Sequence, residues 1–333
     1  MRPLRLPPNP VHRFYRGGEA IARFRGEPST DDHVPEDWVG STTTVFGDGE
    51  TGLARLEDGR TVREAVAADR GAFLGPGRSE PGLLVKLLDA GERLPVHCHP
   101  DREFATRHLD STYGKTEAWA IVETRSERPV VGLGFREAVD DDALADWVES
   151  QDVDALLGLL NELPVAAGDV VFVPAGVPHA IGEGILMVEL QEPTDLSVLL
   201  EWDGFAIDGR ADGHLGLGFE TALSAVDRSA WSGDRLAALS RSTAEGSERL
   251  RLLPPEAAPF FGGERLRPAR ELELDPSFAI LVVLGGRGRL DCADGGLDLA
   301  RGDTVLVPHG AGPCTLAGEL DVIRCLPPEP RND

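Results

Sequence analysis

The sequence predicts a mainly β protein of two similar antiparallel barrels, with a small helical insertion in the first. Its apolar segments are mostly short, rich in Val, Ile, Leu and Thr, and bounded by Gly or Pro, as expected for strands. A strand–turn–strand unit also occurs twice, at 168–181 and at 302–316, and one unit used twice predicts two barrels of one kind. The copies align without a gap, with Gly168 on Gly302, Pro174 on Pro308, Gly176 on Gly310 and His179 on Pro313.

The other elements follow from local periodicity. Apolar residues at helical spacing predict a short helix at 61–68 and a pair of helices within 140–163, each of the pair beginning at Asp-rich positions. A broken helical patch is expected at 220–239. Strands are expected at 38–46, 83–88, 117–123, 129–135, 170–173 and 185–190, around the histidines at 97 and 99, and as a series of short strands over 249–326.

Two domains are expected in a chain of 333 residues. The first is residues 1–215, with the helical insertion at about 138–163, and the second is residues 216–333. The glycine-rich stretch 203–218 predicts a loop or lid between them. Residues 1–36 are rich in Pro, Gly and Arg and predict extended coil with turns.

Composition excludes some partners. A net charge of −24 argues against nucleic acid and anionic membranes, because phosphate backbones are bound by clustered Lys and Arg. The sequence has neither a signal peptide pattern nor an apolar run of ~18 residues, so a cytoplasmic location is expected. The four cysteines lack CxxC spacing, and we expect free thiols, with a pair among the last three left open.

Three histidines predict a metal site in the first barrel. In a strand, His97 and His99 lie on one side and Cys98 on the other, and two imidazoles on one side form half of a transition-metal site. The spacing Gly91-x5-His-x-His and the spacing Gly168-x5-Pro-x-Gly-x2-His resemble the two motifs of the cupin family. By that resemblance His179 is a third ligand, and the second barrel, with Pro313 there, is a degenerate, metal-free cupin-like jelly roll.

Two glutamates are candidates for a carboxylate ligand. Glu103 has the usual cupin spacing but lies in a segment expected to be an exposed helical turn. Glu117 opens a strand expected to be buried, where a carboxylate without a partner is costly and a metal ion offsets the cost. We expect Glu117.

The runs HPDREFATRHLDSTYGKTEAWAIVE and GDVVFVPAGVPHAIGEGILMVELQEPTD resemble the class I, zinc-dependent mannose-6-phosphate isomerases. The resemblance is close over about 83–196 and implies that His97, His99, Glu117 and His179 hold one Zn²⁺. The family has Gln in place of His97, and a set of three histidines also suits Fe²⁺, Mn²⁺, Co²⁺ or Ni²⁺.

The same resemblance implies catalytic residues. Glu189 corresponds to a glutamate proposed for proton transfer. Independently of the resemblance, strand alternation places Lys115 on the same side as Glu117, and we expect Lys115 to bind an anionic group of the substrate or to stabilise the charge that develops in catalysis. Leu199 stands where the family has an arginine implicated in catalysis. Arg210, as a substrate-binding residue, and Arg107 are candidates to replace that arginine.

The implied function is metal-dependent interconversion of mannose 6-phosphate and fructose 6-phosphate through an enediol. Because of Leu199, an isomerase or epimerase of a different sugar, either phosphorylated or unphosphorylated, is an alternative. An Fe²⁺ oxygenase and a non-catalytic sugar-binding or regulatory cupin remain open as well. The expected partner is a small sugar or sugar phosphate.

Overall fold

Along the central strands β6, β11 and β4 of the N-terminal unit, which contains the histidines, successive side chains point to opposite faces of the sheet. The computed structural model describes residues 1–29 and 31–329. On β6, Trp119 packs into the interior of the unit, whereas Ala118 packs on the opposite face, against the C-terminal unit. Burial of both faces explains the nearly continuous apolar runs in these strands. Their seven-stranded antiparallel sheet has the order β13 (Ser240–Ser242), β9 (Asp169–Val173), β6 (Glu117–Thr124), β11 (Ile185–Gln191), β4 (Leu84–Asp89), β3 (Glu36–Val39), β2 (Pro10–Val11).

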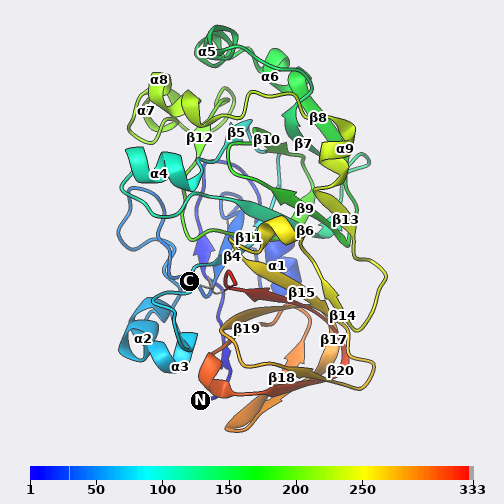
Figure 1. Cartoon of the computed structure of the whole chain (residues 1–333). Coiled ribbons are helices and arrows are strands. Elements are labelled where there is room, and N and C mark those ends of the chain that lie inside the picture. The colour runs from blue at the N-terminus through cyan, green and yellow to red at the C-terminus, as the bar shows by residue number, and fades with distance from the viewer. Residues whose placement is uncertain (30, 330–333) are drawn as a thin grey trace.

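A five-stranded antiparallel sheet closes the interior from the other side. It carries the helical insertion, which lies at the top of the molecule in Figure 1. Its order is β12 (Val198–Leu199), β5 (His97–Cys98), β10 (His179–Ile181), β7 (Val130–Phe135), β8 (Leu160–Pro164).

The C-terminal unit is one eight-stranded antiparallel sheet folded around its own core, seen in orange and red at the bottom of Figure 1. A separate core joins the two units, where Phe172 and Leu190 pack in one cluster with Ile280 and Ile323. The order is β1 (Leu4–Arg5), β19 (Thr304–Val307), β17 (Ala279–Cys292), β20 (Cys314–Leu326), β15 (Gly262–Leu266), β14 (Arg249–Arg251), with β16 (Glu271–Leu274) on β20 and β18 (Gly295–Ala300) on β17.

Short helices cover the ends and edges of the sheets. Thr61 begins α2 with a capping box, in which its hydroxyl accepts from the backbone of Glu64 and the Glu64 carboxylate accepts from the backbone of Thr61. The helices are α1 (Glu19–Arg25), α2 (Val62–Ala68), α3 (Arg70–Leu74), α4 (Arg102–His108), α5 (Asp141–Ser150), α6 (Val153–Leu159), α7 (Gly209–Asp212), α8 (Phe219–Ala222) and α9 (Gly233–Ala237), with 3-10 turns η1 (Leu223–Ala225), η2 (Pro255–Ala257) and η3 (His309–Ala311).

The structure contains the repeated unit seen in the sequence. Gly168 and Gly302 precede β9 and β19 with φ of 94° and 90°, a left-handed conformation that favours glycine. After a Pro-x-Gly turn the first copy continues into β10 with His179, and the second into β20 just beyond Pro313.

The strand pairing bears on the domain boundary. β13, at 240–242, pairs with β9, and Trp231 packs in the interior of the N-terminal unit. Conversely, residues 4–5 pair with β19 of the C-terminal unit. We therefore propose to move the boundary from residue 215 to near residue 245.

Several elements differ from the sequence predictions. The strand expected at 38–46 ends at Val39, because Gly40 adopts a positive φ and the chain turns away. The helical pair is confirmed, but it ends at Leu159 and β8 follows directly. The 203–218 stretch contains the single turn α7. No helix in the described residues is both long and apolar enough to cross a membrane.

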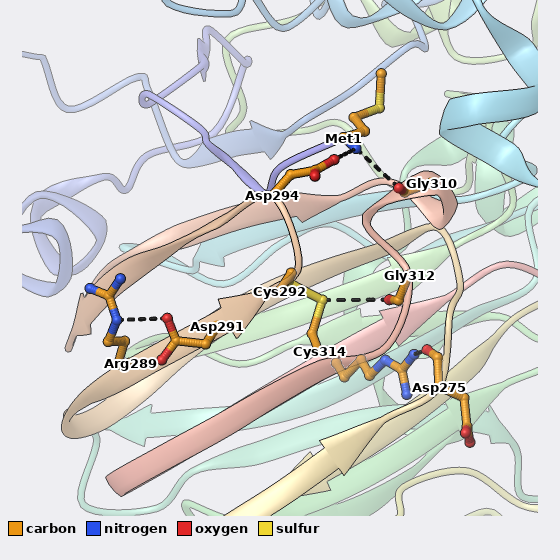
Figure 2. The surroundings of a disulfide bond; sticks show 10 residues. Met1, Asp275, Arg289, Asp291, Cys292, Asp294, Gly310, Gly312 and Cys314 are labelled. Carbon is orange, nitrogen blue, oxygen red and sulfur yellow. Dashed lines mark hydrogen bonds and ion pairs between the residues drawn. A yellow bond between two sulfur atoms is a disulfide. The ribbon is translucent and has the colours of Figure 1, made fainter.

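A disulfide joins Cys292 and Cys314, so the expectation of free thiols is wrong for these two residues (Figure 2). The cysteines face each other where β17 pairs with β20. The N-terminal amine binds the nearby Asp294 carboxylate, so the chain start is held at the same hairpin. Cys98 and Cys325 are free and buried. Disulfides are uncommon in reducing compartments, and the cytoplasmic location stays a prediction.

We expect the disulfide to stabilise the C-terminal unit. It closes a loop between residues 22 apart, which corresponds to about 3 kcal/mol of unfolding free energy. Reductant should lower the urea midpoint of the wild type, and the C292S/C314S variant should have that lower midpoint with or without reductant. A wild-type midpoint that does not respond to reductant would contradict this expectation.

Candidate metal centre

Three imidazoles meet inside the N-terminal unit. His97 on β5 is paired directly with His179 on β10, and His99 follows one residue after β5 ends. The ring centroids lie 4.1 Å apart for His97 and His179, and 4.9 Å apart for each of the other two pairs. All three side chains are buried.

Backbone carbonyls determine which ring nitrogen carries the proton. His97 Nδ1 donates to the Pro95 carbonyl at 2.8 Å, and His99 Nδ1 lies 2.9 Å from the Leu196 carbonyl. His179 Nδ1 donates to the Val177 carbonyl at 2.9 Å. A carbonyl can only accept, so each Nδ1 holds the proton and each Nε2 presents a lone pair. Carbonyls orient metal-binding histidines in the same way.

Glu117 adds a carboxylate to these lone pairs. Its Oε2 lies 3.0 Å from His99 Nε2, and its Oε1 lies 3.4 Å from His179 Nε2. Glu117 Oε2 and His179 Nε2 are buried without a hydrogen-bond partner. Buried acceptors that face one another without a proton between them are unfavourable, and a cation bound among them removes the cost. Three imidazole nitrogens and a carboxylate fit a divalent transition metal, and the arrangement is that of a metal site.

Glu103 lies elsewhere. It is on α4, its side chain is 76% exposed, and it binds Arg107 one helical turn away. An exposed carboxylate with its own partner does not offer a ligand to the three imidazoles. Of the two glutamates that the sequence suggested, only Glu117 lies at the centre.

The environment keeps the imidazoles neutral. Burial lowers the pKa of His99 to about 3, assisted by the positive charge of Lys115. Burial also lowers the pKa of His179, and it holds the pKa of His97 well below its usual range. Although burial opposes ionisation of Glu117, nearby positive charge, that of Lys115 included, keeps its pKa well below the usual range. Neutral imidazoles and an ionised carboxylate are the protonation states that bind metals.

Lys115 reaches the same centre. Its Nζ lies 2.9 Å from His99 Nε2 and 3.5 Å from Glu117 Oε2. Lys115 is buried and lines the cavity beside the histidines. The sequence placed Lys115 and Glu117 on one side of a strand, and the structure has both side chains at the centre.

Glu189 lies in the same cavity, held by a buried ionic network. Lys86 on β4 is paired with Glu189 on β11, and its Nζ lies 3.3 Å from Glu189 Oε2 and 3.5 Å from Glu36 Oε2. Tyr15 and Trp38 also donate to Glu36. Burial raises the pKa of Glu189 to about 8, with a contribution from the negative charge of Glu117 and against the attraction of Lys86.

The cavity beside His97 shares lining residues with an open groove. Leu199 borders both spaces and is paired with His97 across β12 and β5. Arg210 lies on α7, donates to the Glu149 carbonyl and is absent from the described residues that line the cavity. This placement argues against the substrate-binding role expected for Arg210, and Arg107 is likewise occupied by Glu103.

The cavity residues that were not anticipated include Arg13, Glu36, Lys86 and Asp195. The pairing of β4 with β11 brings Lys86 beside Glu189, and an isolated sequence does not show this contact. The one signal in the sequence is the alternation of side chains along strand 83–88, which places Lys86 on the same side as Leu84 and Leu88.

Known proteins share both sequence and fold with this chain. The model of the cupin domain of mannose-6-phosphate isomerase matches residues 264–327. Mannose-6-phosphate isomerase ManA of Bacillus subtilis (strain 168) is 29% identical over 316 residues, which cover 92% of this chain and 93% of that protein.

Solved structures of mannose 6-phosphate isomerases are similar to this chain in fold. The mannose 6-phosphate isomerase from Bacillus subtilis superimposes with a TM-score of 0.78 at 25% identity, covering 98% of this chain and 99% of that one. A mannose 6-phosphate isomerase solved with bound zinc and yttrium has a TM-score of 0.73 at 15% identity, covering 98% and 100%. At that identity the second likeness shows the fold alone.

We expect the H99A variant to lose bound metal. The substitution removes one of the ligand nitrogens and leaves an empty space beside Glu117 in place of the imidazole. The metal content of purified protein, measured by mass spectrometry, should fall by at least about tenfold. The control is H108A, which alters a histidine on α4 outside the cluster. Retention of stoichiometric metal by H99A would refute the site.

Acid should destabilise the protein once its metal has been removed by chelator. The imidazole pKa values are lower in the folded chain than the ~6.5 of an unfolded chain, so the unfolded chain takes up protons first as pH falls. The unfolding free energy should therefore decrease from about pH 7.5 to pH 5. The unfolding free energy, measured by urea denaturation, should depend less steeply on pH in the H99N variant than in the wild type. Equal slopes for the two proteins would contradict the burial of neutral imidazoles.

Proposed function

Because the chain belongs to the mannose-6-phosphate isomerase family, we propose that it is a metal-dependent isomerase that interconverts mannose 6-phosphate and fructose 6-phosphate. One observation carries this proposal. The Nε2 lone pairs of His97, His99 and His179 and the Glu117 carboxylate converge at one end of a cavity that also contains Lys115 and Glu189.

We propose that His97, His99, Glu117 and His179 hold one Zn²⁺ per chain. Imidazole nitrogens with one carboxylate are ligands that zinc prefers, although Fe²⁺, Mn²⁺, Co²⁺ and Ni²⁺ accept the same donors. When bound, the metal supplies Lewis acidity that polarises the carbonyl oxygen of the sugar and stabilises negative charge on it.

Glu189 moves the proton in this proposal. As a carboxylate it takes the proton from C2 of the aldose, the C–H electron pair forms the C1–C2 double bond, and the carbonyl pair moves to O1. The proton of the O2 hydroxyl then passes to O1 through the enediol. Glu189 returns its proton to C1, while the electron pair left on O2 forms the carbonyl bond of the ketone. The reaction is redox-neutral and needs no further reactant. Lys86, 3.3 Å from Glu189, holds the carboxylate in the cavity.

Lys115 stabilises negative charge on the sugar oxygens. Its Nζ lies beside His99 and Glu117 and is buried, so its charge acts over a short distance with little screening by water. Burial of the surrounding residues also keeps water from the reacting carbons.

A second candidate is an isomerase or epimerase of an unphosphorylated sugar. Leu199 favours it, because an apolar side chain borders the cavity where the resemblance implies an arginine. A panel of aldoses and aldose 6-phosphates in a coupled assay separates the two candidates.

The experiment uses the metal-loaded protein in deuterated water. We expect mannose 6-phosphate to be converted with solvent deuterium incorporated at C1 of fructose 6-phosphate. Replacing Glu189 by Gln should lower kcat by at least about 100-fold without loss of metal, because Gln cannot take up a proton. The matched control is E183Q on the exposed turn between β10 and β11. Sugar binding without exchange would contradict catalysis, and turnover of unphosphorylated aldoses alone would support the second candidate.

A further inference from the structure

We propose that Arg13 binds the phosphate group of the substrate and so determines selectivity for a phosphorylated sugar. The inference rests on the proposed isomerase function and adds a residue and a role to it. Arg13 comes from the N-terminal segment between β2 and α1, far in sequence from the motifs that supply the metal centre.

Arg13 lies at the boundary between the inner cavity and the outer groove. The inner cavity includes His97, Lys115 and Glu117, and the outer groove includes Phe46 and Ile207. The residues common to both spaces are Arg13, Phe14, Asp195, Ser197 and Leu199. Because the reacting carbons of the sugar lie beside the histidines, the other end of the sugar chain points towards this boundary.

Arg13 is also the positive charge available there. Among the described residues that line the outer groove, it is the one arginine or lysine. The other two cations of the inner cavity already form ion pairs near the histidines. Lys86 pairs with Glu36 and Glu189, and Lys115 pairs with Glu117. An anionic group at the mouth of the cavity therefore meets Arg13.

The guanidinium has donors left for a ligand. Two of its five N–H groups bind Asp195, at 3.0 Å and 3.3 Å. Its Nε is buried without a hydrogen-bond partner and lies 3.6 Å from the nearest Glu36 oxygen. An arginine fork with free donors suits phosphate, whose oxygens accept two parallel bonds.

The backbone holds Arg13 in place. Its amide donates to the His33 carbonyl at 3.0 Å, and the next residue, Phe14, accepts from the Ala206 amide and stacks edge-on with Phe205. The carboxylate of Asp195 fixes the guanidinium orientation and also accepts from the Phe46 amide. Leu199 contributes no donor at this place, so the N-terminal segment supplies the cation.

The test compares R13M, R13K and the wild type as metal-loaded enzymes. We expect R13M to raise the KM for mannose 6-phosphate and the inhibition constant of inorganic phosphate by about 10- to 100-fold, with kcat changed less than about threefold. R13K, which keeps the charge but loses the fork, should lie between R13M and the wild type. The matched control is R16M, since Arg16 is exposed, binds Glu92 and lies outside the cavity.

Two further measurements keep the inference falsifiable. Metal content and the melting temperature show whether R13M is folded, and R13M/L199R should regain part of the lost phosphate affinity if a cation at this place is what matters. A fall in kcat with unchanged KM, or an unchanged inhibition constant, would overturn the inference. If the wild type turns over no aldose phosphate, the proposed function fails, and calorimetric binding of inorganic phosphate to wild type and R13M still decides the role of Arg13.

Discussion

The buried carboxylate of Glu117 is the constraint on which the N-terminal unit depends. It faces the Nε2 lone pairs of His99 and His179, and neither can donate a proton while its Nδ1 is bonded to a carbonyl. Such a set of acceptors is unfavourable in a protein interior unless cations lie among them. Lys115 compensates His99, but Glu117 Oε2 and His179 Nε2 keep no hydrogen-bond partner, which favours a further cation there. The sheets supply the geometry: pairing of β5 with β10 joins two histidines, and alternation along β6 turns Glu117 to the same interior.

The same cost of burying a charge without a partner explains the arrangement of the other polar residues of the cavity. Each cavity carboxylate has a cation nearby: Lys86 lies between Glu36 and Glu189, and Arg13 binds Asp195. This pairing offsets part of the cost of burying these charges and fixes the positions of the Glu189 and Arg13 side chains. The C-terminal unit has the same repeated strands without the histidine, and its apolar contacts cover the back of the seven-stranded sheet. Its role in the structure is therefore support of the sheet that carries Glu117 and Glu189.

The three histidines and Glu117 could be singled out from the sequence because they belong to short motifs, and the structure has their side chains close together. That they hold a metal stays a prediction. Glu117 was chosen over Glu103 because the family resemblance implies it, and the cost of burying a carboxylate without a partner pointed the same way. The structure has Glu117 buried and Glu103 exposed. Arg13 was missed because its segment has no periodicity and reaches the cavity only through tertiary contacts with His33 and Ala206. A disulfide among the last three cysteines was left open, and the pairing of Cys292 with Cys314 was not predicted for a related reason, since the register of β17 and β20 brings these two together.

The central claim is that one divalent metal lies among His97, His99, Glu117 and His179. An anomalous difference map from crystals of the purified protein, recorded on both sides of the zinc absorption edge, tests it most directly. The account predicts one peak within bonding distance of the three Nε2 atoms and the Glu117 carboxylate, at roughly 2.0–2.2 Å. A map without a peak there, from protein that is active as an isomerase, would contradict it.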